Sequence, residues 1–216
     1  MEIKMGGILK STWEMLHDGR FLKKALMIAC PVALQGMLNT IVNMVDTLMI
    51  GGLGSTAIAA VGLANKVFFV FSLLVFGIVS GGGILAAQFW GSGDVKNIRK
   101  VLGLCVMLAM VGAMFFVVPA LTAPRMVMRI FTTSEGSIEL GAKYLRIAAL
   151  SYPFIALTNV YVAMLRATNK VVFPVICSCI AIVVNICLNY VLIFGKFGAP
   201  TMGVAGAACA TLTALS

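Results

Sequence analysis

The stretch KVLGLCVMLAMVGAMFFVVPALTA, residues 100–123, contains no charged side chain after Lys100. A helix needs roughly 20 apolar residues to cross the roughly 30 Å of hydrocarbon in a bilayer, and this run is long enough to do so. Its apolar residues are continuous and do not alternate with polar ones, as they would in a strand of a membrane β-barrel. We therefore predict a membrane-spanning helix here.

Similar apolar runs precede and follow this stretch, and the charged residues gather between them. Apolar residues make up 61% of the 216 residues and charged residues only 11%, which excludes an ordinary soluble domain. Lipid offers backbone groups no water to bond, so the runs must form helices. We predict an all-α polytopic membrane protein, with a transmembrane bundle over 25–216 behind a cytoplasmic amphipathic leader at 1–24. The six predicted spans lie near 25–50, 57–90, 100–123, 138–163, 171–194 and 202–216.

Turn and kink signals divide these runs. Residues 91–93, Gly-Ser-Gly, mark a turn after the second span. Between the third and fourth spans, the loop 132–136 offers Thr and Ser as helix caps, and Glu135 favours the positive end of the following helix. Pro31 and Pro153 fall within spans, where neighbouring helices can absorb the lost hydrogen bonds, and are candidate kink positions.

The formal net charge of +9 is better explained by membrane topology than by nucleic-acid binding. The basic residues form no stripe and have no aromatic platform beside them. With a cytoplasmic N-terminus, ten Lys and Arg residues lie on the cytoplasmic side and five on the other, which is the bias that orients membrane proteins. We expect a multi-pass protein of the inner (cytoplasmic) membrane, with no nucleic-acid partner. The five on the far side are Arg125, Arg129, Lys143, Arg146 and Lys196.

The chain offers few residues for a metal cluster or for hydrolytic catalysis. Its six cysteines lie within or at the ends of spans without metal-ligand spacing, so we interpret them as small packing residues. The single histidine, His17, precedes the first span, so neither a His–metal cluster nor a Ser/His pair can form in the bundle. We therefore expect no enzymatic activity, no metal site and no cofactor.

Polar side chains follow one face of the first predicted span. Gln35, Asn39, Asn43 and Asp46 are spaced at 4, 4 and 3 residues, so they lie on one narrow face of a helix. We call these four residues the polar stripe. Exposing the polar stripe to lipid would cost free energy, so the stripe must face protein or a water-filled cavity. Asp46 is the one carboxylate in the interior of a predicted span, about one and a half turns before Gly51, toward the outer side.

Other spans offer polar counterparts to the polar stripe. In the fifth, Ser178, Asn185 and Asn189 share a face, and two amides one turn apart can donate to a carboxylate or accept from a cation. In the fourth, Tyr144, Ser151 and Thr158 recur every seven residues, and Thr211 is the hydroxyl of the sixth. A carboxylate in such surroundings can alternate between two protonation states, as an antiporter requires. The alternative is an Asp held in hydrogen bonds between helices.

Several segments, in their order and spacing, carry a family resemblance. They are a Pro early in the first span, Tyr144 in the fourth, VNMVDTLMIGGLG at 42–54, AAQFWGSGD at 86–94, MLRATNK at 164–170, VNICLNYVLIFG at 184–195 and MGVAGAACAT at 202–211. Together they make the chain resemble the multidrug and toxic compound extrusion (MATE) antiporters. The resemblance implies the N-terminal lobe of a twelve-helix fold, with two six-helix bundles around a cleft. It also implies H⁺- or Na⁺-coupled export of small organic cations, which are cationic amphiphilic drugs and xenobiotics.

The resemblance also implies roles for single residues. Asp46 matches the first-helix carboxylate implicated in ion coupling, and Asn185 matches a polar position near it. Asn189 stands where some branches carry a second Asp, so a relay of two carboxylates is in doubt here. The candidate ion-coupling residues are Asp46, Asn185, Asn189 and Thr211, and the candidate cavity residues are Gln35, Asn39, Asn43 and Tyr144.

The length of the chain departs from the family pattern. The chain ends at Ser216, inside the sixth predicted span, and corresponds to about half of a family member. We expect a fragment with an incomplete sixth helix, for which the C-terminal bundle is the missing partner. A lipid-linked oligosaccharide flippase of the same superfamily is the alternative function. It would need several cavity cations to hold a pyrophosphate, and, apart from the Lys and Arg residues assigned to the two sides of the membrane, only Lys66 is available.

Overall fold

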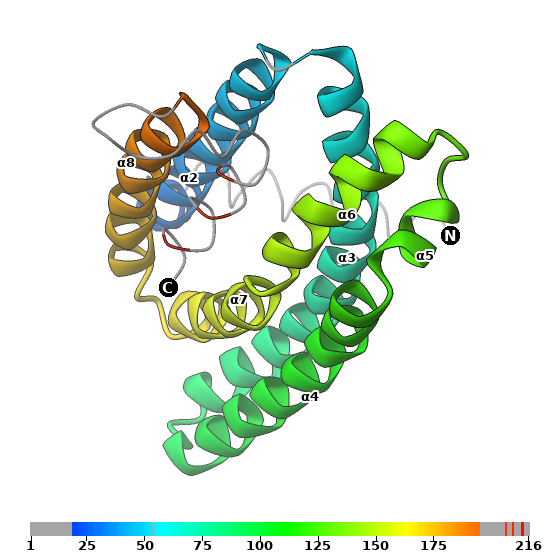
Figure 1. Cartoon of the computed structure of the whole chain (residues 1–216). Coiled ribbons are helices and arrows are strands. Elements are labelled where there is room, and N and C mark those ends of the chain that lie inside the picture. The colour runs from blue at the N-terminus through cyan, green and yellow to red at the C-terminus, as the bar shows by residue number, and fades with distance from the viewer. Residues whose placement is uncertain (1–18, 53, 195–205, 207–208, 210–212, 214–216) are drawn as a thin grey trace, which may run out of the picture.

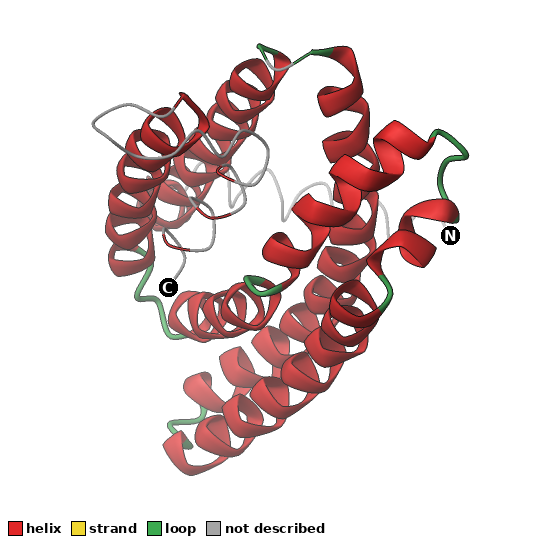
Figure 2. Ribbon diagram, in the orientation of Figure 1, coloured by secondary structure: helices red, strands yellow, loops and turns green. Residues whose placement is uncertain are grey.

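The computed structural model describes residues 19–52 and 54–194, together with residues 206, 209 and 213 (Figure 1). This part of the chain folds into helices joined by short loops, and it contains no strand (Figure 2). The predicted all-α fold is confirmed. Residues 1–18 of the predicted leader, and almost all of the sixth predicted span, lie outside the described residues. The helices are α2 (Gly19–Gly51), α3 (Ser55–Gly91), α4 (Val95–Thr122), α5 (Pro124–Arg129), α6 (Glu135–Ala149), α7 (Tyr152–Ala167) and α8 (Val172–Phe194).

Several helices are long and apolar enough to cross a membrane. α3, α4 and the segment Val172–Leu192 of α8 each meet this condition alone, and α6 and α7 meet it as a bent pair. Large apolar side chains remain exposed on α3 and α4, including Phe69, Phe76 and Phe115. Such extensive exposed apolar surface is typical of a protein that contacts lipid or another protein. The chain therefore forms a helical membrane bundle.

The helices pack in two groups. α3, α4, α6 and α7 contact one another, while α2 packs along α8 and contacts α3 less extensively. Figure 1 shows α2 and α8 side by side and running in the same direction. This pair lies apart from the α3–α4 pair (Figure 1). The polar residues of the first and fifth predicted spans are thereby brought onto neighbouring helices.

An aromatic cluster forms the centre of the four-helix group. The rings of Phe71 on α3 and Tyr152 on α7 are stacked, with centroids 4.7 Å apart and planes at 9°. Phe68 packs against Tyr152 at 5.8 Å, and Phe116 on α4 meets Phe71 edge-on at 5.7 Å. Phe71 is fully buried and Tyr152 nearly so. Because stacked and edge-to-face pairs add to the gain from burial, this cluster fixes how α3, α4 and α7 meet.

Glycine permits the close approach of α3 and α4. A methyl group at Gly82 would lie 2.2 Å from the Cys105 sulfur, and one at Gly112 would lie 2.5 Å from a Leu74 methyl carbon. Small residues at helix crossings are a general means of packing membrane helices, because dispersion contacts replace the hydrophobic driving force. The α3–α4 hairpin is therefore held by contact along its length.

The α3–α4 turn follows the predicted pattern. Gly93 adopts φ 74°, a left-handed conformation that glycine tolerates. Asp94 is the N-cap of α4, and its carboxylate accepts hydrogen bonds from the Asn97 backbone N–H at 3.1 Å and the Asn97 Nδ2 at 2.6 Å. This cap satisfies a donor of the first turn that has no partner within the helix.

The stretch 138–163, predicted as one span, is divided between α6 and α7, which meet at 47°. Pro153 lies in the first turn of α7 and cannot donate to the carbonyl four residues earlier. The Ser151 hydroxyl donates to the Ala148 carbonyl at 2.6 Å beside this gap. Pro153 therefore marks the kink, whereas α2 continues as one helix across Pro31.

Candidate functional site

The polar stripe lies entirely within α2. Because α2 is one continuous helix, Gln35, Asn39, Asn43 and Asp46 keep the spacing that places them on one face. The structure describes the side chain of Gln35, while the side chains of the other three lie outside the described part. The described contacts of the site are therefore those of Gln35 and of the neighbouring helix α8.

Gln35 joins three helices. Its side chain is only 8% exposed. Its Nε2 donates to the Ser178 hydroxyl on α8 at 2.5 Å, and its Oε1 accepts from Nη2 of Arg166, at the end of α7, at 2.6 Å. A charge-assisted bond such as that from Arg166 is stronger than a neutral one. We call these three residues the Gln35 network; it ties the α2–α8 pair to the four-helix group.

The sequence predicted a face for Ser178 but no role for Arg166. Arg166 lies in the charged segment that follows the fourth predicted span, so its charge indicated only the cytoplasmic side. Its place in MLRATNK, at the end of an apolar run and close to the start of the next, was the available signal. Spacing along one helix does not reveal a partner that comes from another helix.

Two buried amides follow Ser178 along α8. The Asn189 Nδ2 donates to the Asn185 Oδ1 at 3.0 Å, and the two side chains are 0% and 7% exposed. Asn185 and Asn189 stand seven and eleven residues after Ser178, so all three share the face of α8 that meets α2. The predicted polar face of the fifth span is thus buried within the described bundle.

The Gln35–Ser178 bond gives a reference point from which positions along α2 and α8 can be counted. The bonded pair Gln35 and Ser178 is separated by 143 residues in the sequence. Parallel helices rise equally, about 1.5 Å per residue. The same separation brings Asp46 to the level of Asn189 and sets Asn43 one residue from the level of Asn185. The sequence could not supply this register, because nothing in it pairs the two helices.

The remaining candidates lie elsewhere. Tyr144, on α6, is half-buried and packs against the hydrophobic core of the four-helix group. Ser151 bonds to its own backbone at the kink, so Tyr144, Ser151 and Thr158 do not follow one straight helix face. Thr211 lies outside the described residues. Lys66 is exposed on α3.

Most of the chain matches a known protein family. The family model described as MatE matches residues 31–191, most of its length. The chain belongs to the MatE family. The match includes the helices that carry the polar stripe, the Gln35 network and the Asn185–Asn189 pair.

Two curated relatives illustrate the similarity of this MatE chain. The "Probable multidrug resistance protein NorM" of Thermotoga maritima is 33% identical over 192 residues, which cover 88% of this chain and 41% of that protein. The "Probable multidrug resistance protein YoeA" of Bacillus subtilis is 32% identical over 191 residues, covering 84% of this chain and 40% of that protein. The MatE chain thus spans about two-fifths of the length of these relatives.

Solved structures share the fold of the MatE chain. One, the outward-facing conformation of a multidrug resistance MATE family transporter of the MOP superfamily, matches with a TM-score of 0.81 at 24% identity. It covers 89% of this chain and 42% of that one. A MOP superfamily transporter from Pyrococcus furiosus matches with a TM-score of 0.80, also at 24% identity, over the same shares. The helical arrangement of this chain is therefore the fold of these structures.

The Gln35 network gives a prediction for stability. Gln35→Leu keeps the side-chain volume but leaves Arg166 without its acceptor and Ser178 without its donor. Losing these part-buried hydrogen bonds should lower the free energy of unfolding by about 1 kcal/mol. Unfolding by sodium dodecyl sulfate in mixed micelles measures this change. The matched control is Thr40→Val, because Thr40 is exposed on the same helix and, within the described part of the chain, donates only to the Gly36 carbonyl. Equal stabilities for the two variants would contradict the bridging role.

Proposed function

We propose that this chain is the N-terminal half of a cation-coupled antiporter that exports cationic, amphiphilic compounds across the cytoplasmic membrane. Its relatives are named as multidrug resistance proteins, and its fold is that of transporters of this kind. The observation that carries the proposal is the register of α2 and α8. Counted from the Gln35–Ser178 bond at an equal rise along both helices, position 46 falls near the level of the buried amides, which supports the proposal.

The coupling follows from electrostatics. A carboxylate within a membrane bundle is costly when charged and unpaired, so it binds a proton, a sodium ion or a cationic substrate. In our proposal Asp46 holds one of these at a time, and the amides of α8 supply neutral ligands that suit each state. Uptake of the coupling ion from outside would then favour release of the substrate on the outer side, because the ion and the substrate compete for the Asp46 carboxylate.

The orientation belongs to the same proposal. We place the N-terminus in the cytoplasm, because the larger share of Lys and Arg falls on that side. Position 46 then lies toward the outer end of α2, where it meets external ions first. The substrate class is small organic cations, and the coupling ion is H⁺ or Na⁺.

Dye efflux tests this function. The full-length gene product would be expressed in bacteria that lack their own dye pumps, and ethidium accumulation would be followed by fluorescence. We expect energised cells to hold several-fold less ethidium than vector controls. Collapse of the proton gradient alone, or of the sodium gradient alone, should restore accumulation and so identify the coupling ion. Accumulation equal to the vector control, with the protein present in the membrane, would overturn the proposal. Export of a lipid pyrophosphate in place of ethidium would favour the flippase instead.

A further inference from the structure

A hollow of about 350 Å³ opens between α5 and α6, away from the polar stripe. Three cationic side chains line it, Arg125 from α5 and Lys143 and Arg146 from α6, together with the carboxylate Glu139. Glu139, Lys143 and Arg146 are spaced at four and three residues, so they share one face of α6. The hollow therefore carries a local excess of two positive charges.

The charges in this hollow are incompletely paired. Lys143 Nζ lies 3.4 Å from Glu139 Oε1, but both side chains are more than half exposed, and such surface pairs are weak. Within the described part of the chain, neither Arg125 nor Arg146 forms an ion pair. Two guanidinium groups thus converge on one space without a carboxylate of their own.

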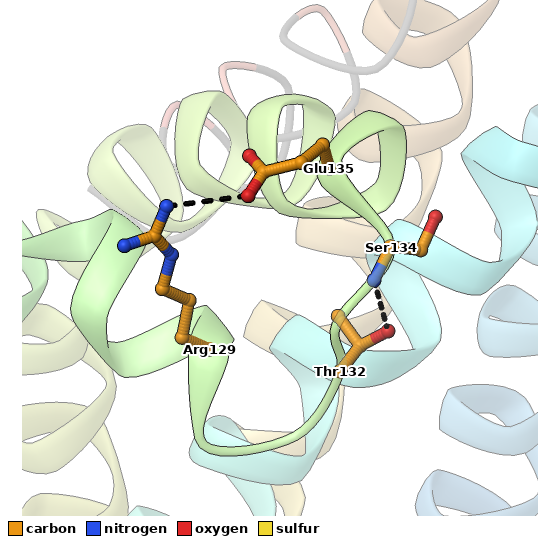
Figure 3. A network of polar contacts seen from close by, with 4 residues as sticks. All are labelled: Arg129, Thr132, Ser134 and Glu135. Atoms are coloured by element: carbon orange, nitrogen blue, oxygen red, sulfur yellow. Dashed lines mark hydrogen bonds and ion pairs between the residues drawn. The ribbon is translucent and has the colours of Figure 1, made fainter.

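Among the described residues Arg129, unlike Arg125, has a carboxylate partner. It lies one turn after Arg125 on α5, and its Nη2 contacts the Glu135 carboxylate at 3.2 Å (Figure 3). In the same connection, the Thr132 hydroxyl accepts from the Ser134 N–H at 3.2 Å (Figure 3). Ser134 is the N-cap residue of α6, although its own side chain makes no capping bond. The Arg129–Glu135 pair is itself exposed and therefore weak, but it gives Arg129 a carboxylate partner that Arg125 lacks in the described part of the chain.

The hollow lies at an end of a membrane-spanning helix. α4 is long and apolar enough to cross a membrane and ends at Thr122, immediately before α5, so we place the boundary between lipid and water at this level. Met126, which also lines the hollow, is 72% exposed, and Val118, about one turn before Thr122 on α4, is 54% exposed. A ligand here meets positive charge and an apolar helix surface together. Free phosphate would use only the charge, whereas an anionic lipid would use both.

We propose that the hollow between α5 and α6 binds the phosphate of an anionic membrane lipid. Arg125, Lys143 and Arg146 contact the headgroup, and the acyl chains follow the exposed apolar surface of α4. Guanidinium and ammonium groups suit this ligand because both donate charge-assisted bonds to phosphate oxygens. The site explains why three of the five basic residues on this side of the membrane gather at one point.

Lipid retention tests the site directly. The full-length protein, purified in detergent, would be titrated with dioleoyl phosphatidylglycerol, and bound lipid would be counted by native mass spectrometry. Each cation removed by Arg125→Gln, Lys143→Gln or Arg146→Gln should weaken binding about fivefold, since each basic residue near a lipid surface contributes roughly 1 kcal/mol. Glu139→Gln should strengthen binding, because it removes the one negative charge of the hollow. Dioleoyl phosphatidylcholine should bind more weakly to the unchanged protein.

A matched triple variant controls for general surface charge. Lys96, Arg99 and Lys100 lie at the opposite end of α4, and their replacement by Gln should leave binding at the hollow unchanged. An equal loss in both triple variants would overturn the proposal, as would unchanged binding in the Arg125, Lys143 and Arg146 triple variant. Displacement of the lipid by millimolar inorganic phosphate would assign the hollow to free anions instead. Glu139→Gln removes no cation, so weaker binding in that folded variant would also count against the site.

Discussion

Replacing Asp46 with Asn should abolish coupled dye efflux by the full-length exporter without reducing its level in the membrane. Asn has nearly the same shape as Asp but cannot carry a charge, so it cannot hold a proton, a sodium ion or a cationic dye by ion pairing. We expect at least a tenfold lower initial efflux rate, equivalent to about 1.4 kcal/mol or more. Ethidium efflux from preloaded cells, normalised to membrane expression, provides the measurement.

A second readout separates coupling from folding. In proteoliposomes, substrate addition should release protons or sodium ions from the unchanged protein, and Asp46→Asn should remove that signal even where substrate still binds. Thr40→Ala is the matched control, because Thr40 lies on another face of α2 and is exposed. Unchanged efflux in Asp46→Asn at normal expression would contradict the coupling role and leave Asp46 as a packing residue.

The membrane itself made much of the fold predictable. Lipid removes every alternative to the helix for an apolar run, so composition and charge clustering sufficed to locate α3, α4 and α8. The helix α5 escaped prediction, because its six residues are too few for a periodic pattern. The break between α6 and α7 was harder for another reason. Pro153 indicated a kink, but the sequence around it carries no sign of the angle or of the two-residue gap.

The sequence predicted which helix faces carry the polar residues of the candidate site, but not which of these residues contact one another. Spacing placed Gln35 on a polar face of one helix and Ser178 on a polar face of another, and the structure brings these two together. Spacing could not show that Arg166 joins them, because that contact depends on how α7 ends beside α2. Helix faces are properties of a sequence, whereas the choice of which faces meet is made by packing in three dimensions.

Replacing Phe71 with Ala should strongly destabilise the four-helix group. Phe71 is 0% exposed and contacts Tyr152, Phe116 and Phe68, so its removal leaves a cavity shared by three helices. Truncation of a buried Phe costs about 3–5 kcal/mol in soluble proteins. Lipid tails are as apolar as a protein interior, so the transfer contribution is small and the cavity dominates. We therefore expect a loss near the lower limit, about 3 kcal/mol.

Phe69→Ala provides the matched control, since it makes the same chemical change two residues away on α3. Phe69 is 63% exposed, and its removal leaves no cavity within the bundle. Both variants would be unfolded by sodium dodecyl sulfate in mixed micelles, with helix content followed by circular dichroism. Phe71→Ala should unfold at a clearly lower detergent fraction, while Phe69→Ala should stay within about 0.5 kcal/mol of the unchanged protein. Similar losses in the two variants would mean that the aromatic cluster does not hold α3, α4 and α7 together.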